Sequence, residues 1–339
     1  MKLVTYLTKD GHDQLAFLHN DFLYNADTMH PELPSSMGMF LQYWDDFFPI
    51  AQQVNAALIE GKLSSNSAVE FASTKVLAPV PFPSSCRDGY AFRQHVAAAR
   101  RNRGVPMIPE FDQYPIFYFS NHNSIQGPGK IKCMPDHFDK LDFELEAAIV
   151  VKKLGRNVRA ANADEYIGGL MIMNDMSART LQMEEMLLNL GPAKGKDFST
   201  VIGPMLVTLD ELEKYEVPCK ENHTGKAWNL KMTCKVNGIQ VSEGNVSDMD
   251  WTFAEILERC SYGVTIHPGD VIGSGTVGTG CFLELNGTGK LNNPDYEAQW
   301  LKEGDIVEME IDALGTLTNN IVKEDGENDF SLLKLKKGV

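Results

Sequence analysis

The chain has 339 residues, of which 43% are hydrophobic and 23% charged, and its formal net charge is −15. This composition is typical of a globular protein with a large core, and it excludes a disordered chain. The 46 acidic residues outnumber the 31 lysines and arginines, which argues against binding to nucleic acid or to an anionic membrane, since both require clustered positive charge.

Two further features bear on where the protein works. No apolar run approaches the ~20 residues that span a bilayer, and the N-terminus becomes polar by Lys9 without an apolar signal segment. The six cysteines have no C-x-x-C spacing, which favours reduced thiols over disulfides or a zinc site. We therefore expect a cytoplasmic protein.

Residues 1–78 predict a small N-terminal α+β domain. A strand at 3–7 and a hairpin at 14–26 precede a helix over 40–61 that ends at Gly61. Residues 76–85 contain three prolines and are typical of a stiff connector. We place the domain boundary near Pro79, so the second domain covers residues 79–339.

The second domain begins with a segment that favours a helix over 90–102. Asp88 is a suitable N-cap, and His95 follows seven residues later on the same helix face, since seven residues make nearly two turns. The pair is either the wall of a site or a capping aspartate with an unrelated histidine. Arg103, in the basic helix end, either meets solvent or attracts a carboxylate substrate.

After a strand at 114–120 and a long loop at 121–140, residues 141–151 predict a strand. Alternation places Asp142, Glu144 and Glu146 on one face of it, with neighbouring carboxylates about 7 Å apart. Like charges at this spacing require screening by water or a cation between them. The face is therefore either solvent-exposed or part of a cation site.

An apolar strand at 168–175 ends in Asp175, and a helix is expected over 177–189. Arg179 and Gln182 are three residues apart and so share a helix face. Asp175 is then either the N-cap of this helix with Arg179 as its partner, or one wall of a site with both side chains.

Two glycine-rich segments do not fit nucleotide-binding motifs. Residues 191–200 carry Lys196 but lack the P-loop spacing and its Ser or Thr. The G-x-G-x-x-G at 273–278 precedes residues 281–287, in which we expect a β-strand carrying Glu284 and not the required helix. We expect these glycines and Thr276 to let the backbone approach a ligand.

Elsewhere we expect an Asn237-Gly238 hairpin, a helix at 248–263, and strands over 301–322.

Taken together and in chain order, these motifs resemble the fumarylacetoacetate hydrolase superfamily over about residues 84–289. The resemblance rests on D-x-Y with Q-H at 88–95, ELE at 144–146, MND-x-SAR-x-x-Q at 173–182, G-K at 195–196, SGT at 274–276 and LEL at 283–285. Asp88 together with His95 is most similar to the fumarylacetoacetase branch. Gly89 stands where the family pattern has an aromatic residue.

The resemblance implies an α+β, β-rich fold with a mixed β-roll core, a homodimer, and a divalent cation bound by Asp88, Glu144, Glu146 and Asp175. Four carboxylates without Cys or His suit Mg²⁺ or Ca²⁺, with Mn²⁺ also possible, better than Zn²⁺.

By the same resemblance the protein is a hydrolase that cleaves a C–C bond in a diketo acid such as fumarylacetoacetate or an acylpyruvate, in aromatic amino acid catabolism. His95, oriented by Glu284, would activate water, and Arg179, Gln182 and Lys196 would hold the oxyanion. The residues implied for substrate binding are Tyr90, Tyr118, Thr276 and, for its carboxylate, Arg103. The alternatives are an isomerase or decarboxylase of a 2-oxo acid at the same metal site, or a non-catalytic protein that binds a metal or a sugar acid.

Overall fold

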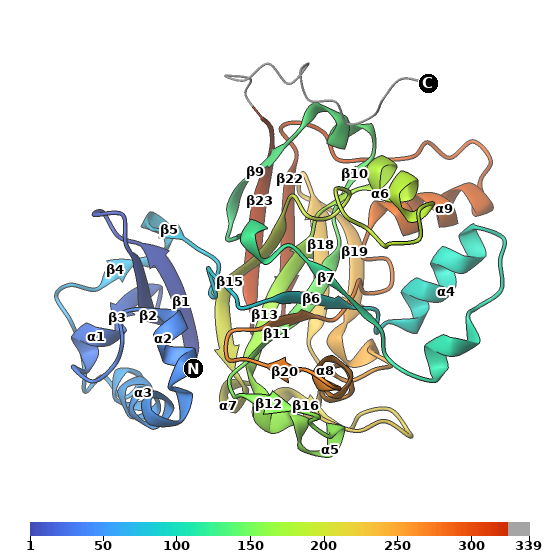
Figure 1. The fold of residues 1–339 in the computed structure, drawn as a ribbon. Coiled ribbons are helices and arrows are strands. Elements are labelled where there is room, and N and C mark those ends of the chain that lie inside the picture. Colours follow the sequence, from blue (N-terminus) through green and yellow to red (C-terminus); the bar gives the residue numbers. More distant parts are fainter. Residues whose placement is uncertain (325–339) are drawn as a thin grey trace.

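The computed structural model describes residues 1–324 and consists of a β-rich body with a smaller unit of strands and helices beside it (Figure 1). The smaller unit contains the expected hairpin. Its elements are β1 (Lys2–Leu7), β2 (Asp13–His19), β3 (Phe22–Asn25), α1 (Ala26–Met29), α2 (Met37–Gln42), α3 (Trp44–Ile59), β4 (Val69–Glu70) and β5 (Lys75–Val76). The single helix expected over 40–61 is therefore two helices that meet at Tyr43.

A twelve-stranded sheet connects this unit to the body. Its strands in the body are β6 (Cys86–Gly89), β7 (Phe117–Ser120), β8 (Ile125–Gln126), β11 (Leu145–Val151), β13 (Ile167–Asp175), β15 (Thr200–Thr208) and β21 (Val271–Gly273). The main path runs β4-β3-β2-β1-β15-β13-β11-β21-β6-β7. The boundary near Pro79 stays a prediction, and β1 pairs directly with β15 of the body.

A second, five-stranded sheet has the order β19-β18-β22-β23-β9. Its strands are β9 (Gly129–Cys133), β18 (Lys231–Val236), β19 (Ile239–Asn245), β22 (Ile306–Ile311) and β23 (Gly315–Lys323), with the Asn237-Gly238 turn between β18 and β19. Apolar side chains of both sheets, such as Ile149 and Met309, belong to one buried core. This sheet-rich α+β arrangement is the predicted fold class.

Helices and two-residue strands complete the body. The helices are α4 (Arg93–Asn102), α5 (Ala160–Ala163), α6 (Arg179–Met186), α7 (Leu209–Leu212), α8 (Phe253–Ser261) and α9 (Phe282–Asn292). The short strands are β10 (Leu141–Asp142), β12 (Gly155–Arg156), β14 (Ser177–Ala178), β16 (Glu216–Val217), β17 (Ala227–Trp228) and β20 (Thr265–Ile266). None of the helices within residues 1–324 has both the length and the apolar character needed to cross a membrane.

Three local predictions are wrong. Asp88 is not a helix N-cap, because it lies in β6, which pairs with β7 and β21, and α4 begins only at Arg93. Residues 282–292, expected to begin as a strand, form helix α9. The segment 121–140, expected to be a surface loop, contains β9, whose Ile131 and Cys133 are buried against β23.

Candidate active site

The four predicted metal ligands lie together on neighbouring strands. Glu146 lies in β11, Glu144 directly precedes it, and Asp175 ends β13, the antiparallel neighbour of β11. Asp88 lies in β6, where it is the register partner of Gly273 in β21, the other neighbour of β11. One carboxylate oxygen from each of the four lies within 4.8 Å of the others, and all four side chains are buried.

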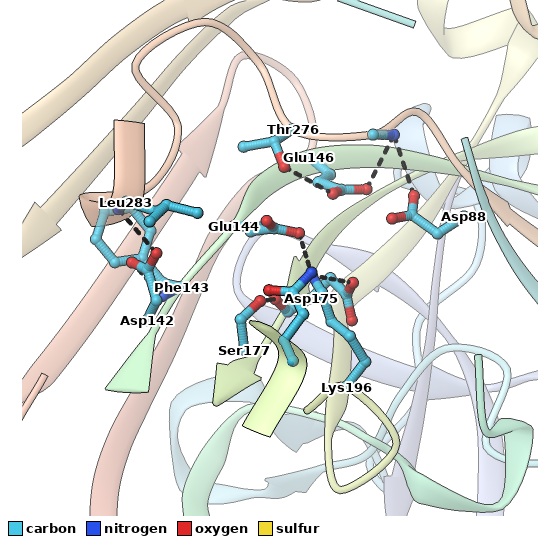
Figure 2. Close-up of polar contacts among 12 residues, drawn as sticks. Asp88, Asp142, Phe143, Glu144, Glu146, Asp175, Ser177, Lys196, Thr276 and Leu283 are labelled. Atoms are coloured by element: carbon cyan, nitrogen blue, oxygen red, sulfur yellow. Dashed lines mark hydrogen bonds and ion pairs between the residues drawn. The ribbon is translucent and has the colours of Figure 1, made fainter. Parts of the chain in front are cut away.

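Hydrogen bonds hold these carboxylates in place (Figure 2). Lys196 donates through Nζ to Glu144 and, at 2.7 Å, to Asp175. The Tyr118 hydroxyl also donates to Asp175. The Gly275 amide donates to Asp88 Oδ1 and to Glu146 Oε2, each at 3.1 Å. A single lysine thus separates two of the acids, while one backbone amide joins the other two.

The glycine-rich segment after β21 has a steric role at this cluster. A Cβ on Gly273 would collide with Asp88 Oδ1 and crowd Glu146, so only glycine leaves room for both carboxylates. Gly275 has φ of +80°, and a Cβ there would lie 2.7 Å from the Gly89 carbonyl oxygen. The G-x-G-x-x-G motif therefore lets the backbone approach the acidic side chains closely.

Charge is unevenly balanced in the cluster. Burial raises the pKa of Asp88 to about 7, with Asp175 adding to the rise. Burial and then the neighbouring Asp88 raise the pKa of Glu146 well above its usual range. Burial acts in the same direction on Glu144, but Lys196 and Arg179 overcome it and lower the pKa of that carboxyl to about 2. The Asp88–Glu146 side is thus short of positive charge.

This shortage is the observation that tests whether the residues fit a cation. Buried like charges are costly unless a proton or a cation neutralises them. All four donors are carboxylate oxygens, which match the ligand preference of Mg²⁺, Ca²⁺ or Mn²⁺. The residues therefore fit a hard divalent cation held by Asp88, Glu144, Glu146 and Asp175.

A histidine–glutamate pair lies on two helices that contact each other. His95 of α4 is 2.6 Å through Nδ1 from Oε2 of Glu284 in α9, and both side chains are buried. The Thr279 amide donates to the other oxygen of Glu284 at 3.0 Å, which fixes the carboxylate. In the neutral imidazole, donation from Nδ1 to this carboxylate leaves Nε2 as the nitrogen with a free lone pair, which can act as a base.

Arg179 and Gln182 are also held in defined positions. Arg179 donates to Glu144 Oε1 at 2.7 Å and, through Nη1, to Gln182 Oε1 at 3.0 Å. The second bond orients the Gln182 amide with its NH₂ group away from Arg179, where it remains available as a donor. The third acidic residue of the 141–151 segment, Asp142, does not join the carboxylate cluster and instead bonds Arg179 Nε at 2.8 Å.

One cavity of about 760 Å³ contains these groups. All predicted catalytic and substrate-binding residues line it: His95, Glu284, Arg179, Gln182, Lys196, Tyr90, Tyr118, Arg103 and Thr276. Asp88 and Glu144 line it as well, so the cavity reaches the carboxylate cluster. Arg103 is exposed, whereas Thr276 is buried beside Glu146.

Several residues that line the cavity were not predicted from the sequence. Lys140, Lys290, Asn102 and Trp300 all face the cavity. Lys140 and Lys290 lie far apart in the sequence and outside any motif, so only the three-dimensional structure brings them together. Asn102 donates to the Glu284 carbonyl oxygen at 3.0 Å, which ties the end of α4 to α9.

The fold and this cavity define a class of protein, a sheet-rich α+β enzyme with a carboxylate cluster suited to a divalent cation. The chain belongs to the fumarylacetoacetate hydrolase family, because the family model described as "Fumarylacetoacetate (FAA) hydrolase C-terminal" matches residues 85–322.

Named relatives and a solved structure extend this result. The human protein "Oxaloacetate tautomerase FAHD2A, mitochondrial" is 31% identical over 306 residues, covering 88% of this chain and 83% of the human protein. "Oxaloacetate tautomerase YisK" of Bacillus subtilis (strain 168) is 29% identical over 254 residues, 74% of each chain. The fumarylacetoacetate hydrolase from Exiguobacterium antarcticum has the same fold, with a TM-score of 0.67, 22% identity, and coverage of 96% of this chain and 100% of that one.

Proposed function

We propose that this protein is a divalent-cation-dependent tautomerase that interconverts the keto and enol forms of a short 2-oxo dicarboxylic acid, of which oxaloacetate is the simplest example. The observation that carries the proposal is the presence of the His95–Glu284 pair and the carboxylate cluster in one cavity. The names of the two relatives favour a tautomerase over the hydrolase expected from the sequence. A tautomerase corresponds to the isomerase alternative of the sequence analysis.

His95 is the proposed proton carrier. In the keto-to-enol direction its Nε2 takes a proton from the carbon beside the carbonyl. The C–H electron pair forms the C=C bond, and the carbonyl electrons move onto oxygen. Returning the proton to that oxygen completes the enol, so no water or second reactant is consumed. Glu284 stabilises the imidazolium ion that exists between the two transfers, as a carboxylate beside a protonated histidine does.

Side chains around the carbonyl would hold the charge that develops on oxygen. The Gln182 amide is oriented by Arg179, and Lys196 lies between Glu144 and Asp175. These donors are fixed before substrate arrives, which is how such groups stabilise an oxyanion most effectively. When bound by the four carboxylates, the cation would supply Lewis-acid stabilisation of the enolate.

C–C hydrolysis of a diketo acid is the second candidate, and the same histidine–glutamate pair favours it. His95 would then take its proton from water, which attacks the carbonyl and releases two fragments. The large cavity also accommodates an acylpyruvate. Likeness to the fumarylacetoacetase branch and a role in aromatic amino acid catabolism stay predictions within this candidate.

An ultraviolet assay of enol absorbance with oxaloacetate and Mg²⁺, Mn²⁺ or Ca²⁺ tests the proposal. His95→Gln should lower kcat by roughly 10²–10⁴-fold, the usual contribution of a general acid–base. His223→Gln is the matched control, because His223 also pairs with a glutamate, Glu255, at 3.0 Å, but outside the cavity. It should retain nearly full activity.

Three outcomes contradict the proposal. Acceleration that survives His95→Gln would remove the proposed proton carrier. Absence of tautomerisation by the wild-type enzyme, with two fragments released from an acylpyruvate, would favour the hydrolase. Absence of turnover on both kinds of acid would favour a non-catalytic binding protein.

The homodimer implied by the family belongs to the same proposal. Leu187, Leu188 and Leu190, which follow α6, expose 79%, 75% and 94% of their surface, and a second copy of the chain would cover such apolar area. The cytoplasmic location expected from the N-terminus also stays a prediction; the human relative's name carries the word mitochondrial.

A further inference from the structure

Asp142 is a fully buried carboxylate that takes no part in the cation cluster. Strict alternation would place it on the face of Glu144 and Glu146. It lies instead in β10, which pairs with β14, and its side chain is on the far side of Glu144 from Asp88 (Figure 2). Its four hydrogen-bond donors come from three separate parts of the chain.

One set of these bonds reaches the start of α9. Asp142 Oδ1 accepts from the Phe282 amide at 2.8 Å, and Oδ2 accepts from the Leu283 amide at 2.9 Å. These are the first two residues of α9, and its N-cap residue, Cys281, makes no side-chain capping bond. Asp142 therefore caps this helix from 140 residues away and lies next to the positive end of its dipole.

The residue that follows these two amides is Glu284, the partner of His95. Fixing the first turn of α9 therefore fixes the position of the glutamate side chain relative to α4. The same Oδ2 atom accepts from Arg179 Nε at 2.8 Å, and Arg179 also donates to Glu144 and Gln182. One carboxylate thus contacts both helix α9, which carries Glu284, and the arginine that orients the Gln182 amide.

We infer that Asp142 is a positioning residue that sets α9, and with it Glu284, in a fixed relation to Arg179, so that His95 and the Gln182 amide act on the same substrate carbonyl. Its kinetic effect rests on the proposed function, whereas its structural effect on the His95–Glu284 hydrogen bond does not.

Asp142→Asn separates this role from simple packing, because the two side chains have nearly the same size. An Asn side chain has one acceptor oxygen and one NH₂ group, so two of the four donors would face another donor. Asp270→Asn is the matched control. Asp270 is also buried, accepts from Arg87 at 3.2 Å and from the His267 amide at 2.9 Å, and does not line the cavity.

The first measurement is a double-mutant cycle on kcat for oxaloacetate with Mg²⁺. Asp142→Asn alone should lower kcat by about 10–100-fold. In a Glu284→Gln or an Arg179→Met background, the same substitution should lower kcat by no more than about threefold. The effects of residues that act through one another are not additive. Asp270→Asn should lower the melting temperature, with kcat of the folded enzyme unchanged and additive effects in both backgrounds.

The second measurement does not depend on turnover. The proton between His95 Nδ1 and Glu284 is in a short hydrogen bond and should give a far-downfield ¹H NMR signal that is absent in His95→Gln. We expect Asp142→Asn to shift or broaden this signal and Asp270→Asn to leave it in place. If Asp142→Asn does not fold, Asp142→Ser takes its place, because a serine hydroxyl can cap α9 but cannot hold Arg179. Asp142→Ser should then lower kcat in the Glu284→Gln background but not in the Arg179→Met background.

The outcomes distinguish the two proposals. An inactive wild type contradicts the proposed function, and the NMR signal then still tests Asp142. An active wild type with additive cycles and an unchanged signal in Asp142→Asn contradicts the positioning role.

Discussion

At the scale of single residues, protons and a cation compete for the same carboxylates. Burial and neighbouring acids raise the pKa of Asp88 to about 7 and that of Glu146 well above its usual range in the metal-free protein. A cation requires these groups ionised, so lowering the pH below 7 must weaken its binding.

The sign follows from linkage. A carboxyl whose pKa is raised by folding stabilises the metal-free protein fully below its unfolded value near 4, and this stability is lost as the pH rises through about 7. Glu144, whose pKa is lowered to about 2, does not titrate in this window. The metal-free protein is therefore destabilised by these acids at pH 8, where a bound cation relieves them most.

We accordingly predict that Mg²⁺ raises the melting temperature more at pH 8 than at pH 5.5. Displacing one proton from a group of pKa near 7 costs about 2 kcal/mol of binding free energy at pH 5.5. Thermal unfolding with and without Mg²⁺, after treatment with a chelator, measures the difference. Asp88→Asn should remove most of the Mg²⁺ effect at pH 8, and an equal gain at both pH values would contradict this account.

The side chains of the site differ in how far the sequence reveals them. The approach of Glu144, Glu146 and Asp175 to one another could be predicted from two strongly apolar strands. Glu144 directly precedes one of them, Glu146 lies near its start, and Asp175 ends the other. Asp142 could not be placed, because the strand breaks between β10 and β11 and alternation fails at that break. Its partners Phe282 and Leu283 lie 140 and 141 residues away, so no local pattern predicts the contact.

At the scale of elements, two short segments show the limits of local pattern. The strand β6 has the sequence CRDG, whose composition is typical of a turn, and it forms because β7 and β21 pair with it on both sides. Helix α9 has the sequence FLELNGTGKLN, with two glycines and low helix propensity, and Asp142 and Asn102 stabilise it from outside. The longer strands β11 and β13 and the Asn-Gly hairpin were predicted, because their own residues carry the apolar pattern and the turn sequence.

Helix α4, which carries His95 in its first turn, also depends on an external cap. Its N-cap residue, Phe92, makes no side-chain bond, and the Arg93 amide donates instead to Asp250 Oδ2 at 2.8 Å. Asp250→Ala should therefore destabilise the protein by about 1 kcal/mol, as loss of a helix cap does. Chemical denaturation measures this loss. Glu303→Ala should leave the stability unchanged, because this residue is exposed and its side chain makes no hydrogen bond or ion pair within residues 1–324. Equal stabilities of the two variants would contradict the capping role.

At the scale of the whole molecule, the net charge of −15 opposes the approach of a dianionic acid. Three exposed cations counter it where they line the cavity: Arg103, Lys140 and Lys290, none of which makes an ion pair within residues 1–324.

These cations should concentrate a dianion at the cavity, and salt should screen the effect, since the Debye length falls from about 30 Å at 0.01 M to about 10 Å at 0.1 M ionic strength. We predict that kcat/KM for a 2-oxo dicarboxylate falls as ionic strength rises. The double variant Lys140→Gln, Lys290→Gln should have a kcat/KM lower by about tenfold at low salt and a flatter salt dependence, because two charges near the entering anion are lost. Lys302→Gln removes an exposed lysine outside the cavity and should keep the wild-type slope. A double variant with that same slope would show that Lys140 and Lys290 do not attract the substrate.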